Sequence, residues 1–242
     1  FAHPNAQHSF GRALVEQISQ ISQQLGVQVR LRDLYAMNFD PILSFEELQE
    51  ANQSIIPPDV KQEHDFILQA DLITLVYPLW WMGFPAILKG YLDRVLSHGF
   101  AYKTENGESQ GLLQNKKMQQ FITLGSNVEK YQRLGVDKSL DHCLINGLFN
   151  YCGIQQVDYQ LFGDIHLIDQ AARQAMQCEA AEKTYKNLTA LLTVMQKSAV
   201  ILEKVFHRAN KFRFPIQKPR QFPYNRKVNF SLMIQNIIRN KK

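Results

Sequence analysis

The chain has 242 residues, which is enough for one domain with an extension but too short for two full-sized domains. Apolar residues make up 45% and charged residues 20% of the sequence, which excludes a wholly disordered, collagen-like or disulfide-dense protein. No apolar run reaches the ~18 residues that a transmembrane helix needs. We therefore expect a globular protein that does not span a membrane.

The formal net charge of +5 is distributed very unevenly. Residues 197–242 contain 12 of the 27 Lys and Arg residues and only one of the 22 acidic residues, Glu203, so their net charge is +11 and that of residues 1–196 is −6. We predict a domain over residues 1–196 followed by a basic, extended tail over 197–242. Two readings of the tail remain open, a solvated extension without a ligand and a segment that contacts nucleic acid or an anionic membrane.

The cysteines and histidines do not suggest a disulfide framework or a metal site. Cys143, Cys152 and Cys178 are odd in number and lack CxxC spacing, which favours reduced, buried thiols in the cytoplasm. No histidine pair has ligand spacing, so no bound metal is expected. No signal-peptide pattern precedes the first helix, which also favours the cytoplasm.

The first predicted elements are a helix and a strand. Ser9 is a suitable N-cap, and apolar residues recur every three or four positions from Phe10 to Leu25, as on one face of an α-helix. Gly26 ends that helix. Residues 27–31 then alternate between apolar and polar side chains, which is typical of a strand.

The middle of the chain repeats this alternation of helix and strand. The sequence predicts helices from Ser44, from Pro57 to about Gln69, and from Pro85 to Leu96, with Pro85 at the first helical position. Residues 72–77, LITLVY, form a continuous apolar run of strand length, as expected of a buried parallel strand.

The later elements continue the pattern with strands at 118–124 and 154–162 and helices at 138–151 and 169–196. Such alternation predicts an α/β fold with a doubly wound parallel sheet and helices on both faces. A sheet of this kind normally opens with a central strand, and this sequence begins at the last residue or two of it. We therefore expect the first strand to be largely absent from the sequence.

Ligands of such sheets bind beyond the carboxyl ends of the strands, so the loops there are candidate sites. The loop His3–Phe10 leads into a helix N-terminus, whose free N–H groups and positive dipole end suit a phosphate. It lacks the GxGxxG and GK[ST] motifs of the common nucleotide-binding loops. A simple capped helix after a polar turn is the alternative reading.

The loop at residues 78–85, PLWWMGFP, contains both tryptophans of the chain. Large flat side chains on such a loop suit a planar aromatic cofactor, because the rings stack and backbone N–H groups bind the ring edge. The alternative is a hydrophobic corner that packs into the core or a dimer interface.

Three segments of the sequence carry a family resemblance. AHPN at residues 2–5, DLYAMNF at 33–39 and PLWWMGFPAILKGYLDRVLSHGFAY at 78–102 resemble the NAD(P)H:quinone oxidoreductases, the flavodoxin-like diaphorases. The resemblance covers about residues 1–190 and does not extend to the tail. It implies a flavodoxin-like sheet of order 2-1-3-4-5, a homodimer and a bound flavin, FAD or alternatively FMN.

The resemblance also implies which residues contact the flavin. The resemblance implies that the loop at residues 3–10 lies around the flavin phosphates and that the loop at residues 78–85 lies along the isoalloxazine ring. The segment ITLGS at 122–126 corresponds to the TTGG segment of the family. The implied cofactor-binding residues are His3, Ser9, Phe10, Gly11, Pro78, Leu79, Trp80, Trp81, Met82, Thr123, Leu124 and Gly125. The family often has Asn where this chain has Gly11, and TTGG is here TLGS.

Two residues are the catalytic candidates that the resemblance implies. Tyr131 matches a tyrosine near the pyrimidine edge of the flavin, where its hydroxyl would stabilise negative charge on the reduced ring. Asp137 stands where the animal enzymes have a histidine, and an aspartate is normally an anion that only accepts hydrogen bonds. Tyr102 and Tyr151 are the implied substrate-pocket residues, with ordinary core or interface aromatics as the alternative.

The implied activity is a two-electron hydride transfer from NAD(P)H through flavin N5 to a quinone. Reduction of nitro or azo compounds is a close variant of the same chemistry. An alternative that is not an enzyme is a flavin-binding regulatory subunit of a membrane potassium-efflux system. In that case the tail would contact the membrane partner. No nucleic-acid partner is expected, because residues 1–196 are acidic.

Overall fold

The structure is a computed structural model that describes residues 1–51 and 55–211. The chain divides into two compact units, residues 1–191 and 192–242. All helices and strands named below lie in the first unit, except that helix α8 (Gln170–Lys211) begins in the first unit and continues into the second. Across the described residues, no helix is both long and apolar enough to cross a membrane.

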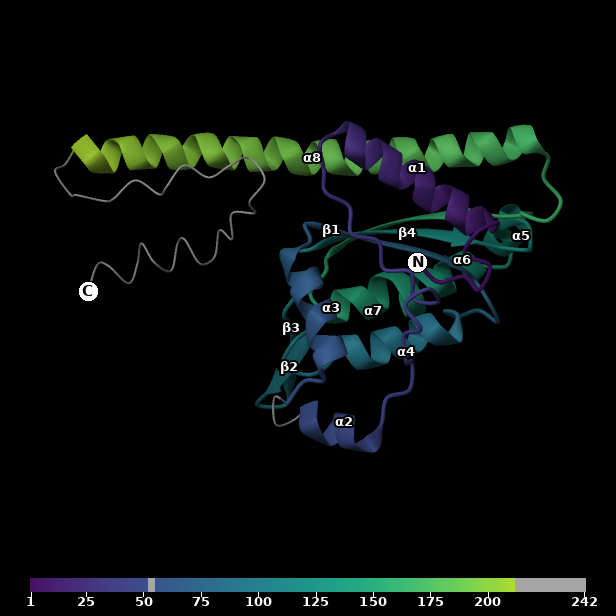
Figure 1. The fold of residues 1–242 in the computed structure, drawn as a ribbon, viewed down its shortest axis with the longest axis horizontal. Helices are drawn as coiled ribbons and strands as arrows, with labels where there is room; N and C mark the ends of the chain where they lie inside the picture. Colours follow the sequence, from purple (N-terminus) through teal and green to yellow (C-terminus); the bar gives the residue numbers. More distant parts are fainter. Residues whose placement is uncertain (52–54, 212–242) are drawn as a thin grey trace. The chain divides into compact units, whose positions relative to one another are not determined.

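The centre of the first unit is a parallel sheet of three strands in the order β1-β4-β5 (Figure 1). These are β1 (Leu72–Pro78), β4 (Lys117–Thr123) and β5 (Gln156–Phe162). Each strand is paired in register along its full length, from Leu72 opposite Lys117 to Thr123 opposite Phe162. The carboxyl ends of the three strands therefore lie together at one edge of the sheet.

Helices cover both faces of this sheet, as Figure 1 shows. On one face, α1 (Phe10–Gln24) and the first turns of α8 bury apolar side chains against the sheet. This cluster includes Leu14 and Ala180 from the helices and Val76, Phe121 and Phe162 from the strands. The steps of three and four between the apolar residues of α1 made this helix predictable, and Ser9 caps it by accepting a hydrogen bond from the Arg12 N–H.

The other face carries the larger core. Helices α3 (Pro58–Gln69), α4 (Ala86–Val95) and α7 (Asn146–Tyr151) pack here. Their buried side chains Val60, Leu88 and Phe149 meet Leu75 and Ile122 of the sheet. The two buried faces confirm the α/β architecture with a doubly wound parallel sheet that the sequence predicts.

The alternating segment at residues 27–33 is not a strand of the sheet. Phe1 and Ala2 lie between it and β1: the Phe1 amino group donates to the Arg32 carbonyl, the Leu34 N–H donates to the Phe1 carbonyl, and the Ala2 N–H donates to the Val76 carbonyl. A strand needs a neighbour along its whole length, and only these two residues occupy the position of the predicted central strand. The prediction of a strand at 27–31 is therefore wrong for this structure.

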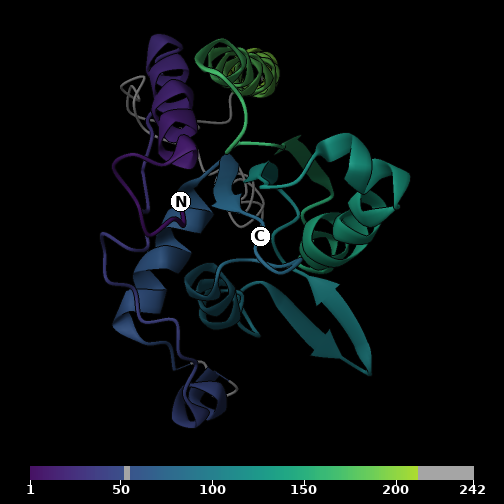
Figure 2. The same ribbon diagram turned by 90° about the vertical axis from the view of Figure 1, so that its right-hand side faces the viewer.

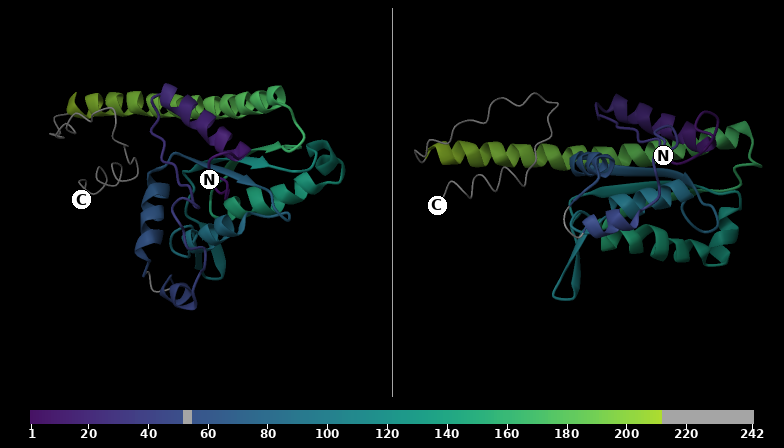
Figure 3. Two further views of the ribbon diagram at one scale, coloured as in Figure 1. Left: turned by 45° about the vertical axis from the view of Figure 1, so that its right-hand side comes forward. Right: turned by 60° about the horizontal axis from the view of Figure 1, so that its bottom comes forward.

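Several further differences have simple causes. A hairpin of β2 (Tyr102–Glu105) and β3 (Glu108–Gly111) joins α4 to β4, and its turn is Asn106-Gly107, with positive φ at both residues. Asn-Gly is the strongest short hairpin signal, so the sequence contained this element. Figure 3 shows the hairpin projecting from the rest of the first unit. Pro85 is the N-cap of α4 and not its first helical residue.

The helix predicted at 138–151 is interrupted. It consists of α6 (Val136–Leu140), a π-helical turn at Asp141–Ile145 and α7, and a short helix α5 (Val128–Arg133) precedes it. A Cβ atom on Gly147 would lie 1.6 Å from the His142 carbonyl oxygen, so only glycine allows the chain to close this wide turn.

Two expectations about the rest of the chain also need correction. Residues 197–211, predicted to be extended, belong to α8, because no proline or glycine interrupts the sequence there. The remainder of the predicted tail, 212–242, lies outside the described residues. Of the three cysteines only Cys152 is buried, whereas Cys143 and Cys178 are exposed. Burial raises the pKa of the Cys152 thiol to about 11.

A buried arginine of α4, Arg94, joins the short helix α2 (Phe45–Ala51) to α4. The Arg94 side chain is 7% exposed and donates to the Glu47 carboxylate, the Asp59 carboxylate and the Asp40 carbonyl. Burial raises the pKa of Asp59, but the hydrogen bond and positive charge of Arg94 and the backbone hydrogen bonds together outweigh it and leave that pKa below its ordinary value.

Candidate functional site

The candidate site is the edge of the sheet where β1, β4 and β5 end, which faces the viewer in Figure 2. Backbone hydrogen bonds hold the loops there together: the Leu79 N–H donates to the Thr123 carbonyl at 2.8 Å, and the Leu124 N–H donates to the Phe162 carbonyl at 2.8 Å. The loop before α1 joins them through the rings of His3 and Trp80, whose centroids are 5.9 Å apart. The structure thus brings the predicted loops to one place.

The first loop presents the N-terminus of α1. The Asn5 N–H donates to Nδ1 of His3 at 3.0 Å and the His8 N–H donates to Oδ1 of Asn5 at 3.1 Å, so the loop closes on itself before Ser9. Partial burial lowers the pKa of His3, which keeps its ring neutral near pH 7. The positive end of the helix dipole is thereby placed at the site without a competing charge on His3.

Phe10 and Gly11 have packing roles beside this helix start. The Phe10 ring is 8% exposed and meets Phe162 edge to face, with centroids 6.1 Å apart. A Cβ atom on Gly11 would lie 3.2 Å from the Phe1 ring, so the absence of a side chain there lets the two segments pack closely. Only their backbone groups are therefore available to a ligand.

The second loop forms a tight turn that displays aromatic side chains. The Trp80 N–H donates to the Gly83 carbonyl and the Gly83 N–H donates to the Trp80 carbonyl, at 3.1 and 3.0 Å. Trp81 and Met82 both have positive φ, 50° and 59°, as in a type I′ turn. Trp81 is wholly exposed and Trp80 and Met82 are partly exposed. An exposed indole on a closed turn is a suitable surface for stacking a planar ring.

The base of this turn is fixed in the core. Phe84 packs on Tyr77 with ring centroids 5.0 Å apart, and the Tyr77 hydroxyl donates to Oε1 of Gln120 at 2.8 Å. Burial raises the pKa of Tyr77, so its hydroxyl remains a donor. The side chain of Leu79 also packs against the core, and Pro78 is the last residue of β1, which together set the direction of the turn.

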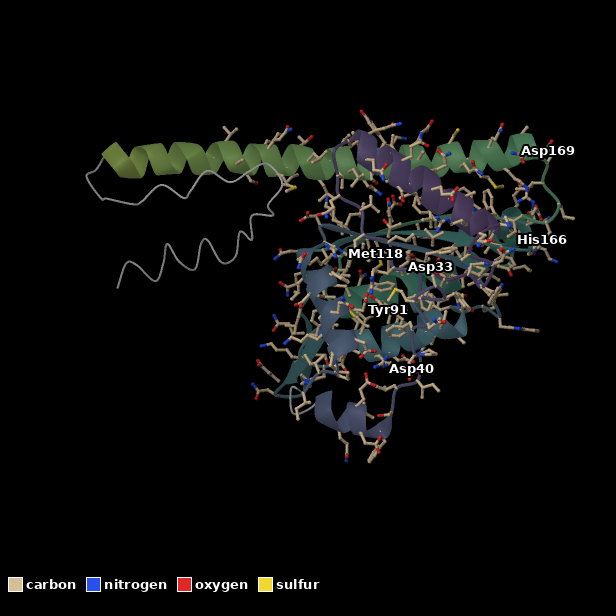
Figure 4. All side chains as sticks on the ribbon, in the orientation of Figure 1. Asp33, Asp40, Tyr91, Met118, His166 and Asp169 are labelled. Atoms are coloured by element: carbon tan, nitrogen blue, oxygen red, sulfur yellow. The ribbon has the colours of Figure 1, made fainter. Side chains whose placement is uncertain are left out.

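The third loop follows β4. The side chains of Thr123 and Leu124 are buried, and the Leu124 carbonyl accepts from the Ile165 N–H at 3.4 Å. Gly125 is exposed, and His166 of the loop after β5 lies near it, at the same end of the sheet in Figure 4. The exposed part of this loop is thus Gly125, whereas Thr123 and Leu124 support it from inside.

The two catalytic candidates lie on neighbouring short helices after this loop. Tyr131 of α5 is half-buried and packs against the main core. Asp137 of α6 has one carboxylate oxygen, Oδ1, that is buried and has no hydrogen-bond partner among the described residues. Burial, followed by the negative charges of Asp141 and Asp137, raises the pKa of Tyr159.

The structure brings Tyr102 and Tyr151 together, but not at the candidate site. Their ring centroids are 5.0 Å apart, and the Tyr151 hydroxyl donates to the Ser109 hydroxyl oxygen at 3.2 Å. Tyr102 pairs with Gly111, and Gly111 packs against Gly153 just before β5 begins. Both tyrosines therefore lie at the amino ends of the strands, about 20 Å from the carboxyl ends for a seven-residue strand.

The loop after β5 also reaches this edge, although it contains none of the predicted site residues. Its residues Gly163–His166 approach the third loop: the Asp164 N–H donates to the Ser126 carbonyl, and the Asp164 carboxylate accepts from the Asn127 side chain at 2.7 Å. The signal for this loop was its position at the end of a predicted strand, since every strand end of a parallel sheet faces the same edge.

A pocket of about 420 Å³ that is open to solvent lies elsewhere in the first unit. Its lining includes Arg32, Phe39 and Glu63 and none of the predicted cofactor residues. There Arg32 forms an ion pair with the buried Glu63, which also accepts from the Tyr91 hydroxyl at 3.0 Å (Figure 4 labels Tyr91).

The residues present fit a flavin on two counts at this edge. The helix N-terminus offers donors for a phosphate, and the Trp80–Gly83 turn offers an exposed indole for a planar ring. The loops that carry these two features are joined by the ring contact of His3 and Trp80. On α6, the buried Oδ1 of Asp137 is an acceptor without a partner among the described residues. The geometry therefore suits a phosphorylated, planar cofactor.

Comparisons with known proteins agree with this geometry. A family model described as a flavodoxin-like fold matches residues 1–188. A Haemophilus influenzae protein, named an uncharacterized NAD(P)H oxidoreductase, is 76% identical over 192 residues, which are 79% of this chain and 95% of that protein. NAD(P)H dehydrogenase [quinone] 1 of Cavia porcellus is 34% identical over 173 residues, and the match spans 63% of each chain.

A solved structure is similar over the same region. The NAD(P)H:quinone oxidoreductase from Methanothermobacter marburgensis is 30% identical, with a TM-score of 0.69 over 76% of this chain and 94% of that chain.

Proposed function

Because the chain belongs to the flavodoxin-like family of NAD(P)H oxidoreductases, we propose that it is a flavin-dependent NAD(P)H:quinone oxidoreductase. The observation that carries this proposal is the junction of the α1 N-terminus with the Trp80–Gly83 turn, through the His3 and Trp80 rings. A phosphate seat beside a stacking surface is what a flavin nucleotide requires. We propose FAD as the cofactor, with FMN as the alternative, and the junction suits either one.

The roles of the cofactor-binding residues follow from their positions. The backbone N–H groups of Phe10 and Gly11 bind phosphate, and Ser9 fixes the helix start that presents them. Trp81 and Met82 cover the ring, and the exposed Gly125 leaves room for the ring edge against the third loop. A bound flavin would supply the two-electron hydride chemistry between NAD(P)H and the acceptor.

The protein side of the reaction concerns charge and protons. The Tyr131 hydroxyl donates a hydrogen bond to negative charge at the ring edge. Asp137 holds a carboxylate with one buried, unpartnered oxygen, so it accepts a hydrogen bond from a donor brought by the ligand. Asp137 thus orients a reactant and does not relay a proton as a histidine does.

We place the substrate-pocket tyrosines in a homodimer. Tyr102 and Tyr151 are paired at the far end of the sheet from their own carboxyl-edge loops, so they serve the site of the partner subunit. Their partly exposed rings then cover the quinone, and the open surface at Trp81 becomes a closed pocket. The protein acts in the cytoplasm in this proposal, on small-molecule acceptors that include quinones and, by the same chemistry, nitro or azo compounds.

The regulatory-subunit alternative has less support. The relatives described above are named as oxidoreductases, and the junction at His3 and Trp80 has the features of a cofactor site.

The test is the absorbance spectrum of the purified protein, followed by anaerobic addition of NADH or NADPH and then of a quinone. We expect flavin bands that bleach with the nicotinamide and return with the quinone. Trp81→Ala should weaken flavin binding about tenfold through lost stacking, measured by flavin fluorescence. Ile42→Ala, which truncates another exposed apolar side chain, is the matched control and should leave binding unchanged. A protein that takes up neither FAD nor FMN contradicts the proposal.

A further inference from the structure

The second unit begins with an unusual stretch of helix. From residue 192 to 211, α8 continues without a break, and its apolar side chains Val194, Met195, Val200 and Ile201 are exposed, Ile201 by 61%. In the first unit, by contrast, the apolar residues Ala180 and Leu188 of the same helix are buried. Exposed apolar side chains that share one side of a helix, as Val194, Met195 and Ile201 do, indicate an interaction surface.

The sequence of this stretch separates into two faces. At 3.6 residues per turn, the apolar residues Leu192, Val194, Met195, Ala199 and Ile201 share one broad side of the helix, with Val200 as an exception. The other side carries Lys197. The sequence repeats this lysine at intervals of seven residues, Lys204 and Lys211, and adds Arg208 and a single acid, Glu203. The stretch is therefore a basic amphipathic helix.

Charge identifies the surface that this helix fits. The sequence from 197 to 242 has a net charge of +11, and aromatic residues are interspersed among its basic residues: Phe206, Phe212, Phe214, Phe222, Tyr224 and Phe230. An apolar face flanked by Lys and Arg, with aromatic residues, is the composition of helices that lie in the interface of anionic bilayers.

A second copy of the chain is a poorer match for this face. The apolar side is about half of the helix circumference, much wider than the seam of a two-stranded coiled coil. Two copies would also bring like charges together, because Lys197, Lys204 and Lys211 have few acids in this stretch to pair with. We propose that residues 192–211 bind the surface of anionic lipid membranes, with Ile201 and its apolar neighbours in the bilayer interface. This inference does not rest on the proposed function.

The test is flotation of the full chain with vesicles, either of phosphatidylcholine alone or with about one third phosphatidylglycerol. We expect binding to the anionic vesicles, little binding to the neutral ones, and release when the salt concentration is raised. Lys197→Gln should lower the partition coefficient on anionic vesicles about fivefold, since one Lys near such a surface contributes a factor of that order.

The apolar face has a matched pair of variants. Ile201→Ala should lower the partition coefficient on anionic vesicles about tenfold, because it removes apolar surface from the interface. Gln196→Ala truncates an exposed polar side chain on the other side of the helix and should change binding less than twofold. Both side chains are exposed, so neither variant threatens folding, which the circular dichroism spectrum verifies.

Four outcomes would overturn the proposal. They are no binding to anionic vesicles, equal binding to neutral vesicles, equal losses for Ile201→Ala and Gln196→Ala, and salt-independent binding. Self-association in sedimentation equilibrium that Ile201→Ala abolishes, without vesicle binding, would instead assign the face to a second copy.

Discussion

Tyr102 and Tyr151 pack against each other at the amino ends of the strands, while the aromatic turn at Trp81 lies at the carboxyl ends. The length of a strand separates the two groups, so one chain does not place them in one pocket. If both serve the same reaction, they come from different subunits. This gives the proposed dimer a test that depends on geometry.

Mixed dimers of a Trp81→Ala subunit and a Tyr151→Ala subunit should recover about half of the wild-type quinone reductase activity. One of their two sites would then combine an intact Trp81 with an intact Tyr151 from the other subunit, whereas each variant alone has two defective sites. Turnover with excess quinone, measured for affinity-purified mixed dimers, checks this. Activity no higher than that of the two homodimers would place Tyr151 in its own chain's site or outside any site.

Asp137→Asn should stabilise the flavin-free protein by about 1 kcal/mol, because the variant removes the charge from a carboxylate with a buried oxygen that has no partner. The same variant should lower kcat/KM about tenfold, since the proposed role of this carboxylate is to accept a hydrogen bond from the ligand. Urea unfolding and steady-state kinetics measure the two effects. Asp71→Asn, at an exposed side chain just before the amino end of β1, is the control and should change neither. A loss of both stability and activity would indicate a structural role for Asp137.

Arg94→Met should lower the free energy of unfolding by about 3–5 kcal/mol, because it leaves the half-buried Glu47 without its cation and releases α2 from α4. The exposed ion pair of Lys89 provides the comparison, and Lys89→Met should cost less than about 0.5 kcal/mol. Urea unfolding of both variants checks the difference. Similar small losses in the two variants would mean that water replaces the Arg94 contacts without cost.

His64 should make the protein less stable at mildly acidic pH. Its ring is buried, stacks on Phe100 with centroids 3.5 Å apart, and donates through Nε2 to the Val95 carbonyl at 2.8 Å. Burial lowers the pKa of His64 below its ordinary 6.5, although the Val95 hydrogen bond opposes this shift. The neutral form is therefore favoured in the folded state.

The contribution of His64 is complete above pH 6.5 and is lost as the pH falls through its lower folded-state pKa. His64→Gln, which keeps a donor for Val95, should flatten the dependence of unfolding free energy on pH between about 7 and 5. His8→Gln, at an exposed ring, is the control and should retain the wild-type profile. An unchanged profile in His64→Gln would show that other groups cause the loss in acid.

Much of the fold was predictable because local pattern and tertiary burial agree in this chain. The apolar run of β1 and the three-and-four spacing of α1 each reflect a face that the sheet buries. The segment at 27–31 has the same quality of pattern and yet forms no strand, because a strand depends on a neighbour that its own sequence does not encode. The hairpin at Asn106-Gly107 was overlooked although its turn signal was present.

The candidate site was predictable as a set of loops but not as a set of side-chain roles. Strand ends identify which loops meet, so His3, Trp80 and Gly125 were expected together. Whether a residue offers its side chain or only its backbone depends on burial, which the sequence does not give for Phe10, Thr123 or Leu124. The separation of Tyr102 from Trp81 likewise required the register of the hairpin.

The closed turn from Trp80 to Gly83 affects both the association rate and the affinity of a ligand. Its reciprocal hydrogen bonds and two left-handed residues fix the backbone before any ligand arrives. A ring that stacks on Trp81 therefore does not have to order a flexible loop. The conformational entropy that the protein loses on association is confined to the Trp81 side chain. Such a preorganised platform favours rapid capture, and differences in affinity among ligands should appear chiefly in their residence times.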